Sequence, residues 1–157
     1  MGIVQQAKPA LALSPAGASP CIGICSVTVG DTVCRGCFRT LDDIAQWSMF
    51  SNEVLTKRLS VRQGVLERSF TDYFELVDEK LLLQQWKKYI NCPPEPRFAV
   101  EAWIQLLHVG ASKIVQIEAY GVRLFPQHQH LTLRHVWRTW RDSLLDARLF
   151  ESNQISG

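Results

Sequence analysis

Apolar residues recur at helical spacing from about residue 40 onward, and this pattern predicts a mainly α fold. The first helix is expected to begin at Thr40, because Asp43 follows three residues later, as in a capping box. A second helix is expected to begin at Ser51, and its apolar face continues as far as Leu66. A third helix is expected over about residues 72–90.

The proline-rich run at residues 91–96 ends the third helix and is the clearest boundary in the chain. A fourth helix is expected over 97–110, followed by a strand-like segment over 113–118 with 119–125 as its extension. After Pro126, residues 131–150 are predicted to form a strongly amphipathic helix. The pattern thus predicts a mainly α, small α+β fold, in which a cysteine-rich metal-binding hairpin precedes a helical, bundle-like body with one or two short strands.

Composition places the chain among ordinary globular proteins, because 46% of its 157 residues are hydrophobic and 20% are charged. Its net charge of +2 is too small to indicate nucleic-acid binding, and no apolar run is long enough for a transmembrane helix. Lys8, Pro9 and Pro15 interrupt the first apolar residues, so we find no secretory signal and expect a cytoplasmic protein. We expect three parts: a flexible tail (1–18), a metal-binding module (19–68) and a helical region of unknown family (69–157).

Four of the five cysteines fall within 17 residues, which is the strongest chemical signal in the sequence. Cys21 and Cys25 form one closely spaced pair, and Cys34 and Cys37 form the other. Residues 26–33 are β-prone and contain a Gly-Asp turn, so they are expected to join the pairs as a short hairpin. Two chelating pairs on one hairpin bring four thiolates to one point, as a tetrahedral metal centre requires.

Other interpretations of the four cysteines are weaker. Two disulfides would suit a secreted chain, but no secretory signal is present. A thioredoxin-like redox pair at Cys34 and Cys37 would need a βαβ context, which residues 1–40 lack. Buried cysteines without any ligand are the third alternative. A metal centre is therefore favoured, with Gly36 turning the backbone so that its amides face the sulfurs, and the spacing leaves zinc and an iron–sulfur cluster both open.

Two motifs and a downstream tryptophan resemble a known protein family. The motifs are Ser19-Pro20-Cys21-x3-Cys25 and Cys34-Arg35-Gly36-Cys37-Phe38-Arg39-Thr40, and they are followed by Trp47. In this order, over about residues 19–60, they resemble DUF1289, a family of small bacterial proteins labelled as predicted iron–sulfur proteins. The resemblance implies an iron–sulfur cluster on Cys21, Cys25, Cys34 and Cys37. For residues 69–157 we find no family resemblance.

These residues predict a metal-binding protein without an independent catalytic activity. No nucleotide-binding glycine loop, nucleophile elbow or HExxH-type motif is present in the sequence. We expect an iron–sulfur accessory protein that acts in electron transfer or redox sensing with an unidentified protein partner. The alternative is a zinc-stabilised module that binds protein or nucleic acid. Arg39 and Lys8 are the nearest cations that would tune thiolate charge, and Trp47 is expected to pack on the site.

A basic face on the last helix has two interpretations. Four arginines lie near that face beside two tryptophans: Arg134, Arg138, Arg141, Arg148, Trp137 and Trp140. Together they suggest a nucleic-acid surface with stacking groups. The apolar spacing favours the other interpretation, in which the tryptophans belong to the core and the solvated face carries an Arg138–Asp142 pair.

Two smaller groups also carry alternatives. His128, His130 and His135 are spaced so that they could converge on a second metal, but exposed loop histidines are the favoured interpretation because no carboxylate or cysteine completes the set. Cys92, in the proline-rich linker, is either a fifth ligand, a resolving thiol or an ordinary linker residue.

Overall fold

The computed structural model describes residues 19–21, 30–92 and 94–151. Several sequence predictions therefore lie outside the described residues: the tail (1–18) with Lys8, and residues 22–29, which include Cys25 and most of the expected hairpin. Within the described ranges, no helix is long and apolar enough to cross a membrane.

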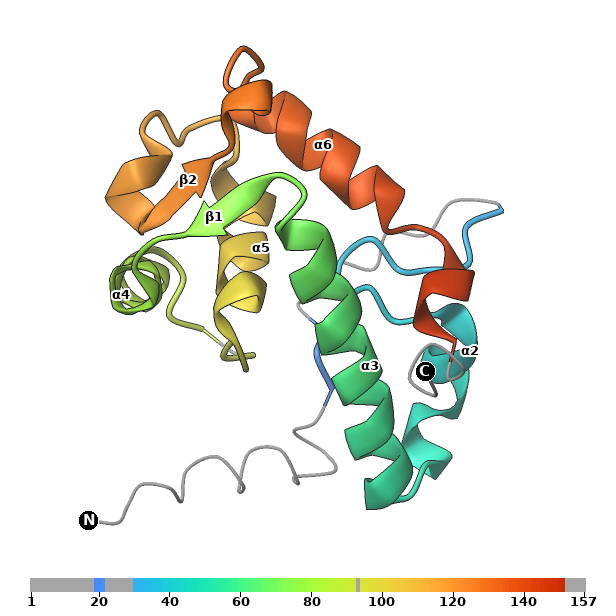
Figure 1. The fold of residues 1–157 in the computed structure, drawn as a ribbon. Helices are drawn as coiled ribbons and strands as arrows, with labels where there is room; N and C mark the ends of the chain where they lie inside the picture. Colours follow the sequence, from blue (N-terminus) through green and yellow to red (C-terminus); the bar gives the residue numbers. More distant parts are fainter. Residues whose placement is uncertain (1–18, 22–29, 93, 152–157) are drawn as a thin grey trace, which may run out of the picture.

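Helices dominate the described parts of the chain, with one small antiparallel sheet (Figure 1). The elements in chain order are α2 (Leu41–Gln46), η2 (Trp47–Met49), α3 (Asn52–Phe70), β1 (Phe74–Leu76), α4 (Glu79–Tyr89), α5 (Ala99–Gly110), η3 (Ile117–Tyr120), β2 (Val122–Leu124), η4 (Pro126–His128), α6 (Leu133–Ser143) and η5 (Ala147–Phe150), where η denotes a short 3-10 helix. This architecture confirms the predicted mainly α, small α+β class.

The two helix starts predicted from side-chain caps are confirmed. Thr40 Oγ1 accepts a hydrogen bond from the Asp43 amide at 3.0 Å, so α2 begins where the sequence pattern placed it. Ser51 Oγ accepts from the Val54 amide at 3.3 Å and begins α3 in the same way. These caps are local, which is why they could be predicted without any knowledge of the fold.

The third predicted helix is wrong at its start. Residues 74–76 form β1, which pairs antiparallel with β2 in the register Phe74 with Leu124, Glu75 with Arg123, and Leu76 with Val122. Helix α4 begins only after Asp78, whose carboxylate accepts from the Leu81 amide at 3.0 Å. The apolar residues of this segment fit a helix as well as a strand, and pairing with a distant segment decides between them.

Two later predictions also need correction. The strand expected over 113–118 is absent from that described segment, and the strand β2 (Val122–Leu124) lies within the expected extension over 119–125. The last helix, expected over 131–150, ends at Ser143 as α6, and the chain then forms η5. Val136, Trp137, Trp140 and Leu144 are nevertheless buried, as the predicted amphipathic pattern requires, although the helix ends earlier than expected.

Gly121 joins the sheet to α4 and tolerates no side chain. Its φ is +78°, and its carbonyl oxygen accepts from the amides of Val77 and Asp78 at 2.8 and 3.0 Å. A Cβ at Gly121 would meet the backbone carbonyl of Asp78. This glycine is needed for both its backbone conformation and its close approach.

We expect Gly121→Ala to lower the free energy of unfolding by about 2 kcal/mol or more, because it adds left-handed strain and a backbone clash. Gly110→Ala is the matched control, since no atom lies within 4 Å of a Cβ there. That control should be neutral or stabilising by about 0.5–1 kcal/mol. Urea unfolding of both variants checks the pair, and equal stabilities would contradict the close approach.

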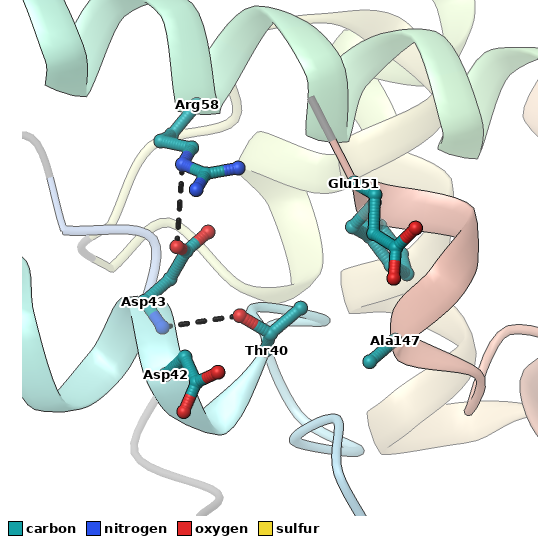
Figure 2. A pocket seen from close by; sticks show the side chains of 7 residues that line it. Thr40, Asp42, Asp43, Arg58, Ala147 and Glu151 are labelled. Carbon is teal, nitrogen blue, oxygen red and sulfur yellow. Dashed lines mark hydrogen bonds and ion pairs between the residues drawn. The ribbon is translucent and has the colours of Figure 1, made fainter. Parts of the chain in front are cut away.

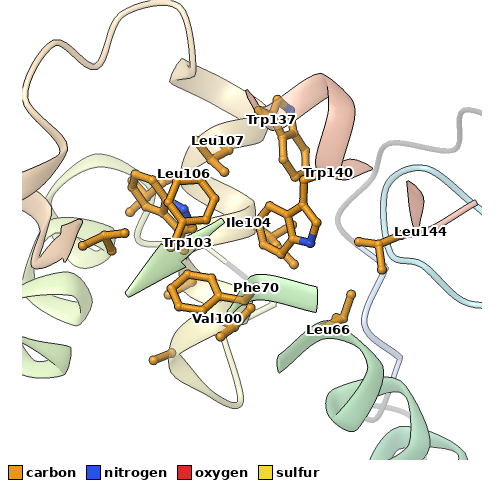
Figure 3. Close-up of a cluster of buried hydrophobic side chains, with 14 of the residues drawn as sticks. Leu66, Phe70, Val100, Trp103, Ile104, Leu106, Leu107, Trp137, Trp140 and Leu144 are labelled. Carbon is orange, nitrogen blue, oxygen red and sulfur yellow. The ribbon is translucent and has the colours of Figure 1, made fainter. Parts of the chain in front are cut away.

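The hydrophobic core is built around α5, in which every residue from Ala99 to Leu107 is buried. Aromatic rings fill the core, and Figure 3 shows Phe70, Trp103 and Trp140 among its buried side chains. The ring of Phe74 lies 5.4 Å from that of Phe70, 5.6 Å from that of Trp103 and 5.7 Å from that of Trp140, centroid to centroid. Thus α3, β1, α5 and α6 all contribute to one cluster. The same cluster includes Val33 and Phe38, which flank the two later cysteines of the predicted metal site.

Candidate metal centre

Cys34 and Cys37 lie on a short loop that is closed by an antiparallel bridge between Val33 and Thr40. Inside the bridge, the Cys34 amide donates to the Arg39 carbonyl at 2.9 Å. The loop turns at Phe38, whose backbone is left-handed with a φ of 58°. Because the Phe38 side chain is fully buried, packing of its ring helps to hold this unfavourable conformation.

Each sulfur of the pair accepts one N–H group. The Gly36 amide donates to Cys34 Sγ at 3.4 Å, which confirms that this turn directs an amide at a sulfur. The Arg39 Nε group donates to Cys37 Sγ at 3.3 Å. Both cysteines are only 2% exposed. Donors of this kind stabilise the negative charge of a thiolate, so the chemistry of the pair fits a metal or cluster ligand.

The Cys37 thiol holds its proton tightly as long as no cation replaces it. A hydrogen bond with Cys34, followed by burial, raises the pKa of Cys37 far above its ordinary value, and Arg39 opposes this shift without cancelling it. A metal cation would displace that proton, because the thiolate is the form that binds zinc or iron. The pair is therefore preorganised in shape, but Cys37 must lose its proton when a metal binds.

The structure places the four predicted ligands unequally. Cys34 and Cys37 are together, Cys21 is exposed at the start of the described residues, and Cys25 lies outside them. Among the described residues, no group of three or more His, Cys, Asp or Glu side chains is placed to hold a metal. The convergence of all four cysteines therefore stays a prediction.

Comparison with known proteins identifies the segment that carries this loop. Residues 19–68 match DUF1289, a family described as a protein of unknown function. The match confirms the resemblance and extends it through most of α3. No curated protein and no solved structure matches the chain. The DUF1289 segment thus contains all four cysteines, while α5, whose His108 packs on Phe38 of the Cys34–Cys37 loop, lies beyond it.

Arg39 links the sulfur of Cys37 to Trp47 within the DUF1289 segment. Its guanidinium carbon lies 4.6 Å from the centroid of the Trp47 ring, while its Nε group contacts Cys37 Sγ. Trp47, expected to pack on the site, therefore reaches it through Arg39. Arg39 is only 8% exposed, so its charge acts on the sulfur with little screening by water.

Arg62 of α3 and Glu101 of α5 connect the loop to these two helices. Sequence analysis did not identify either residue as part of the site. Arg62 Nε donates to the Cys37 carbonyl at 2.6 Å, and its Nη2 lies 2.7 Å from Glu101 Oε2. Glu101 Oε1 also accepts from the Arg97 amide at 2.8 Å. A single carboxylate inside the apolar run of residues 99–107 was the available signal, because a buried carboxylate requires a partner.

His108 of α5 packs between Phe38 of the loop and Trp137 of α6. Its ring centroid lies 6.5 Å from that of Phe38 and 5.0 Å from that of Trp137. Burial, followed by the charge of Arg141, lowers the pKa of His108 to about 4, although backbone hydrogen bonds at Gly36 and Arg35 oppose the shift. The imidazole is therefore neutral at pH 7 and forms part of the wall behind the cysteines.

The stability of the protein should fall as the pH is lowered from about 6.5 towards 4. In this window the unfolded histidine binds a proton and the folded His108 does not, so acid favours unfolding by up to about 2–3 kcal/mol. His108→Gln should lose this part of the pH dependence. Urea unfolding of the two proteins at pH 7, 6, 5 and 4 checks the prediction, and parallel pH curves would contradict it.

A cavity of about 370 Å³ opens beside the end of the loop, between α2, α3 and η5 (Figure 2). Asp42, Asp43 and Glu151 line it together with Arg58. Arg58 Nε lies 3.3 Å from Asp43 Oδ1, so one of these carboxylates is already paired. Burial raises the pKa of Asp43, and the charge of Arg58 opposes that shift. The lining also includes the apolar side chains of Ala147 and Phe150, and none of the described cysteines belongs to it.

The basic face of α6 is only partly as expected. Trp137 and Trp140 are buried, and Trp140 Nε1 donates to Ser69 Oγ at 2.8 Å, so these rings belong to the core. The expected Arg138–Asp142 pair is wrong, because Asp142 contacts Arg141 instead, at 3.3 Å. Arg134 and Arg138 are exposed, as on a solvated face. Arg148, expected on the same helix, lies instead on η5 and pairs with Asp146 at 2.9 Å.

The remaining histidines and Cys92 lie apart from these contacts. His128 packs on Tyr73 with ring centroids 5.0 Å apart, and its Nε2 lies 3.1 Å from the Asp72 carbonyl oxygen. His130 and His135 are exposed. Cys92 is exposed in the linker after α4. None of these contacts gives His128, His130, His135 or Cys92 a ligand role.

Proposed function

We propose that this is a metal-binding protein in which Cys21, Cys25, Cys34 and Cys37 hold one iron–sulfur cluster. The observation that carries the proposal is the loop of Cys34 and Cys37, where two buried sulfurs each accept an N–H group. Such a cluster gains and loses single electrons without an open coordination position. The proposed role is therefore that of an accessory protein for electron transfer or redox sensing.

The residues around the loop suit such a role. The Gly36 amide and the Arg39 guanidinium would stabilise the extra negative charge of a reduced cluster and so raise its reduction potential. Near-complete burial of both cysteines excludes water from that half of the site. We further propose a cytoplasmic location and a protein partner that exchanges electrons with the cluster.

A zinc-stabilised interaction module is the second candidate. It is supported by the packing of Val33 and Phe38 into the core, since a closed four-cysteine zinc site is normally structural and contributes to folding. Its partner would be a protein or a nucleic acid. Because Trp137 and Trp140 are buried, nucleic-acid binding would depend on exposed basic side chains such as Arg134 and Arg138 of α6 rather than on stacking, and it should weaken steeply with salt.

The two candidates differ in metal content and colour. The experiment is to purify the full chain without oxygen and to measure iron, acid-labile sulfide, zinc and the visible spectrum. Iron with sulfide and a band near ~400 nm supports the cluster. One zinc per chain without colour supports the structural module instead. Neither metal in a folded protein would overturn both candidates.

A further inference from the structure

Another cavity lies between the last turn of α3, the end of α6 and η5. Its volume is about 460 Å³, which falls within the usual range of small-molecule sites, about 300–1,000 Å³. Neither the cysteine loop nor the cavity beside that loop contributes a residue to its lining. It is therefore a separate candidate site, and the side chains that line it indicate what it can bind.

Two opposite charges line this cavity without forming an ion pair. Arg68 and Asp72 are both exposed, and their side chains make no hydrogen bond or ion pair with any residue that the structure describes. The Arg68 guanidinium folds back along α3, because its Nη1 would lie 3.1 Å from a Cβ placed on Gly64. Asp72 instead follows the end of α3. The positive and the negative group are thus held apart, and both are available to a ligand.

The two serine hydroxyls of the cavity have already donated their protons. Ser69 Oγ donates to the Leu66 carbonyl at 3.0 Å and accepts from Trp140 Nε1 at 2.8 Å. Ser143 Oγ donates to the Trp140 carbonyl at 2.7 Å. A hydroxyl has a single proton, so what each oxygen can still offer is a lone pair. Both oxygens therefore suit a ligand group that donates hydrogen bonds.

The helix ends at this cavity favour a cation as well. Ser69 lies in the last turn of α3, and Ser143 is the last residue of α6, so the C-terminal ends of two helices line the cavity. The carbonyl groups at a helix C-terminus carry a partial negative charge, and the Asp72 carboxylate adds a full one. An ammonium group, which is positively charged and only donates hydrogen bonds, matches these acceptors.

Apolar side chains complete the lining. Val65 of α3 and Leu144, just after α6, are buried, while Leu149 of η5 is exposed. An aliphatic group placed against these carbons leaves water, and its burial is favourable. The cavity therefore offers a guanidinium for a carboxylate, hydrogen-bond acceptors for an ammonium group and apolar carbons for an aliphatic chain.

We propose that this cavity binds a small zwitterion with an aliphatic side chain, which is the chemistry of an apolar α-amino acid or of a short peptide. Arg68 holds the carboxylate, for which a guanidinium is the best geometric match, and Asp72 with the serine oxygens holds the ammonium group. The inference does not depend on the proposed metal centre, since the two sites share no residue. Val65 and Arg68 belong to the DUF1289 segment, whereas Asp72 and the residues of α6 and η5 lie beyond it.

The test is an NMR titration of the isotope-labelled full-length protein with leucine. Leucine amide, which lacks the carboxylate, and N-acetyl-leucine, which lacks the ammonium group, should each bind about tenfold more weakly, because a charge-assisted hydrogen bond is lost. Glycine should also bind about tenfold more weakly, because it has no aliphatic chain to bury. The indole N–H signal of Trp140 should shift on binding, because this group donates to Ser69 Oγ at the cavity. The dipeptide glycylleucine distinguishes a peptide from a free amino acid: the tighter ligand identifies the source.

Two variants assign the binding groups on the protein. Arg68→Gln should weaken leucine about tenfold but leave leucine amide unchanged, since that ligand has no carboxylate to hold. Asp72→Asn should weaken leucine but leave N-acetyl-leucine unchanged. Arg134→Gln, an exposed arginine of α6 outside the cavity, is the matched control and should bind leucine as wild type does. Because Arg68 and Asp72 are exposed, both variants should unfold in urea close to wild type.

Three results would overturn the inference. The first is that neither leucine nor glycylleucine binds at concentrations up to about 20 mM. The second is that leucine binds but neither Arg68→Gln nor Asp72→Asn weakens it. The third is that leucine, leucine amide and N-acetyl-leucine bind equally well, since the charges of the ligand would then have no partner. Metal content is measured separately, so none of these results bears on the proposed metal centre.

Discussion

Cys37→Ser is expected to lose its bound metal, whereas Cys92→Ser should retain it fully. Serine keeps the size of the side chain, but its hydroxyl does not replace a thiolate as a ligand for zinc or iron. A structural metal can contribute about 10 kcal/mol or more to folding, so loss of one ligand should lower Tm by roughly 10 °C or more. Metal analysis and thermal unfolding on the same preparations check both expectations.

Cys92 is the appropriate control because it is exposed in a linker, while Cys37 is buried in the loop. After removal of the metal, wild type and Cys37→Ser should unfold within about 1 kcal/mol of each other, because the remaining change is a single sulfur atom. Full retention of metal by Cys37→Ser would remove this cysteine from the ligand set. A large stability difference in the metal-free proteins would mean that Cys37 acts mainly through packing.

Arg62→Ala should be among the most damaging single substitutions outside the cysteines. It leaves the Glu101 carboxylate buried without its ion-pair partner and the Cys37 carbonyl without its donor. Breaking a buried pair in this way costs about 3–5 kcal/mol. Arg68→Ala, on the same helix but exposed, should change the free energy of unfolding by less than about 0.5 kcal/mol.

A double variant shows whether the cost arises from the orphaned charge. Arg62→Met combined with Glu101→Leu removes both charges and keeps most of the volume, so it should recover much of the stability lost in Arg62→Ala. Urea unfolding of the metal-free proteins measures this without interference from metal binding. If the double variant is as unstable as the single one, the hydrogen bonds to the Cys37 carbonyl and from the Arg97 amide matter more than the ion pair.

The features that could be predicted from sequence depend on neighbours in the chain. The caps at Thr40 and Ser51 each need only a side chain and an amide three residues away. The Cys34–Cys37 turn is equally local, since its bonds join residues 33 to 40. The left-handed backbone conformation of Phe38 within this turn was not predicted, because phenylalanine rarely adopts it.

The features that were missed depend on contacts between distant segments. Strand β1 exists because residues 74–76 pair with 122–124, a choice that the helical spacing of that segment cannot reveal. The pairing of Arg62 with Glu101 brings together α3 and α5, which are separated by the sheet strand, α4 and the proline-rich linker. A single sequence does not show which distant residues contact one another. The part of the candidate site formed by Arg62 and Glu101 could therefore be recognised only in the structure.

The stacking of Arg39 on Trp47 gives the protein its own optical probe. Trp86, Trp103, Trp137 and Trp140 belong to the hydrophobic core, whereas Trp47 lies outside that cluster and is joined to the Cys37 sulfur through one guanidinium group. A change in charge at the sulfur changes the electrostatic force on the cation that covers this indole ring. The fluorescence of Trp47 should therefore report the occupancy of the cysteine loop in real time, with no label attached.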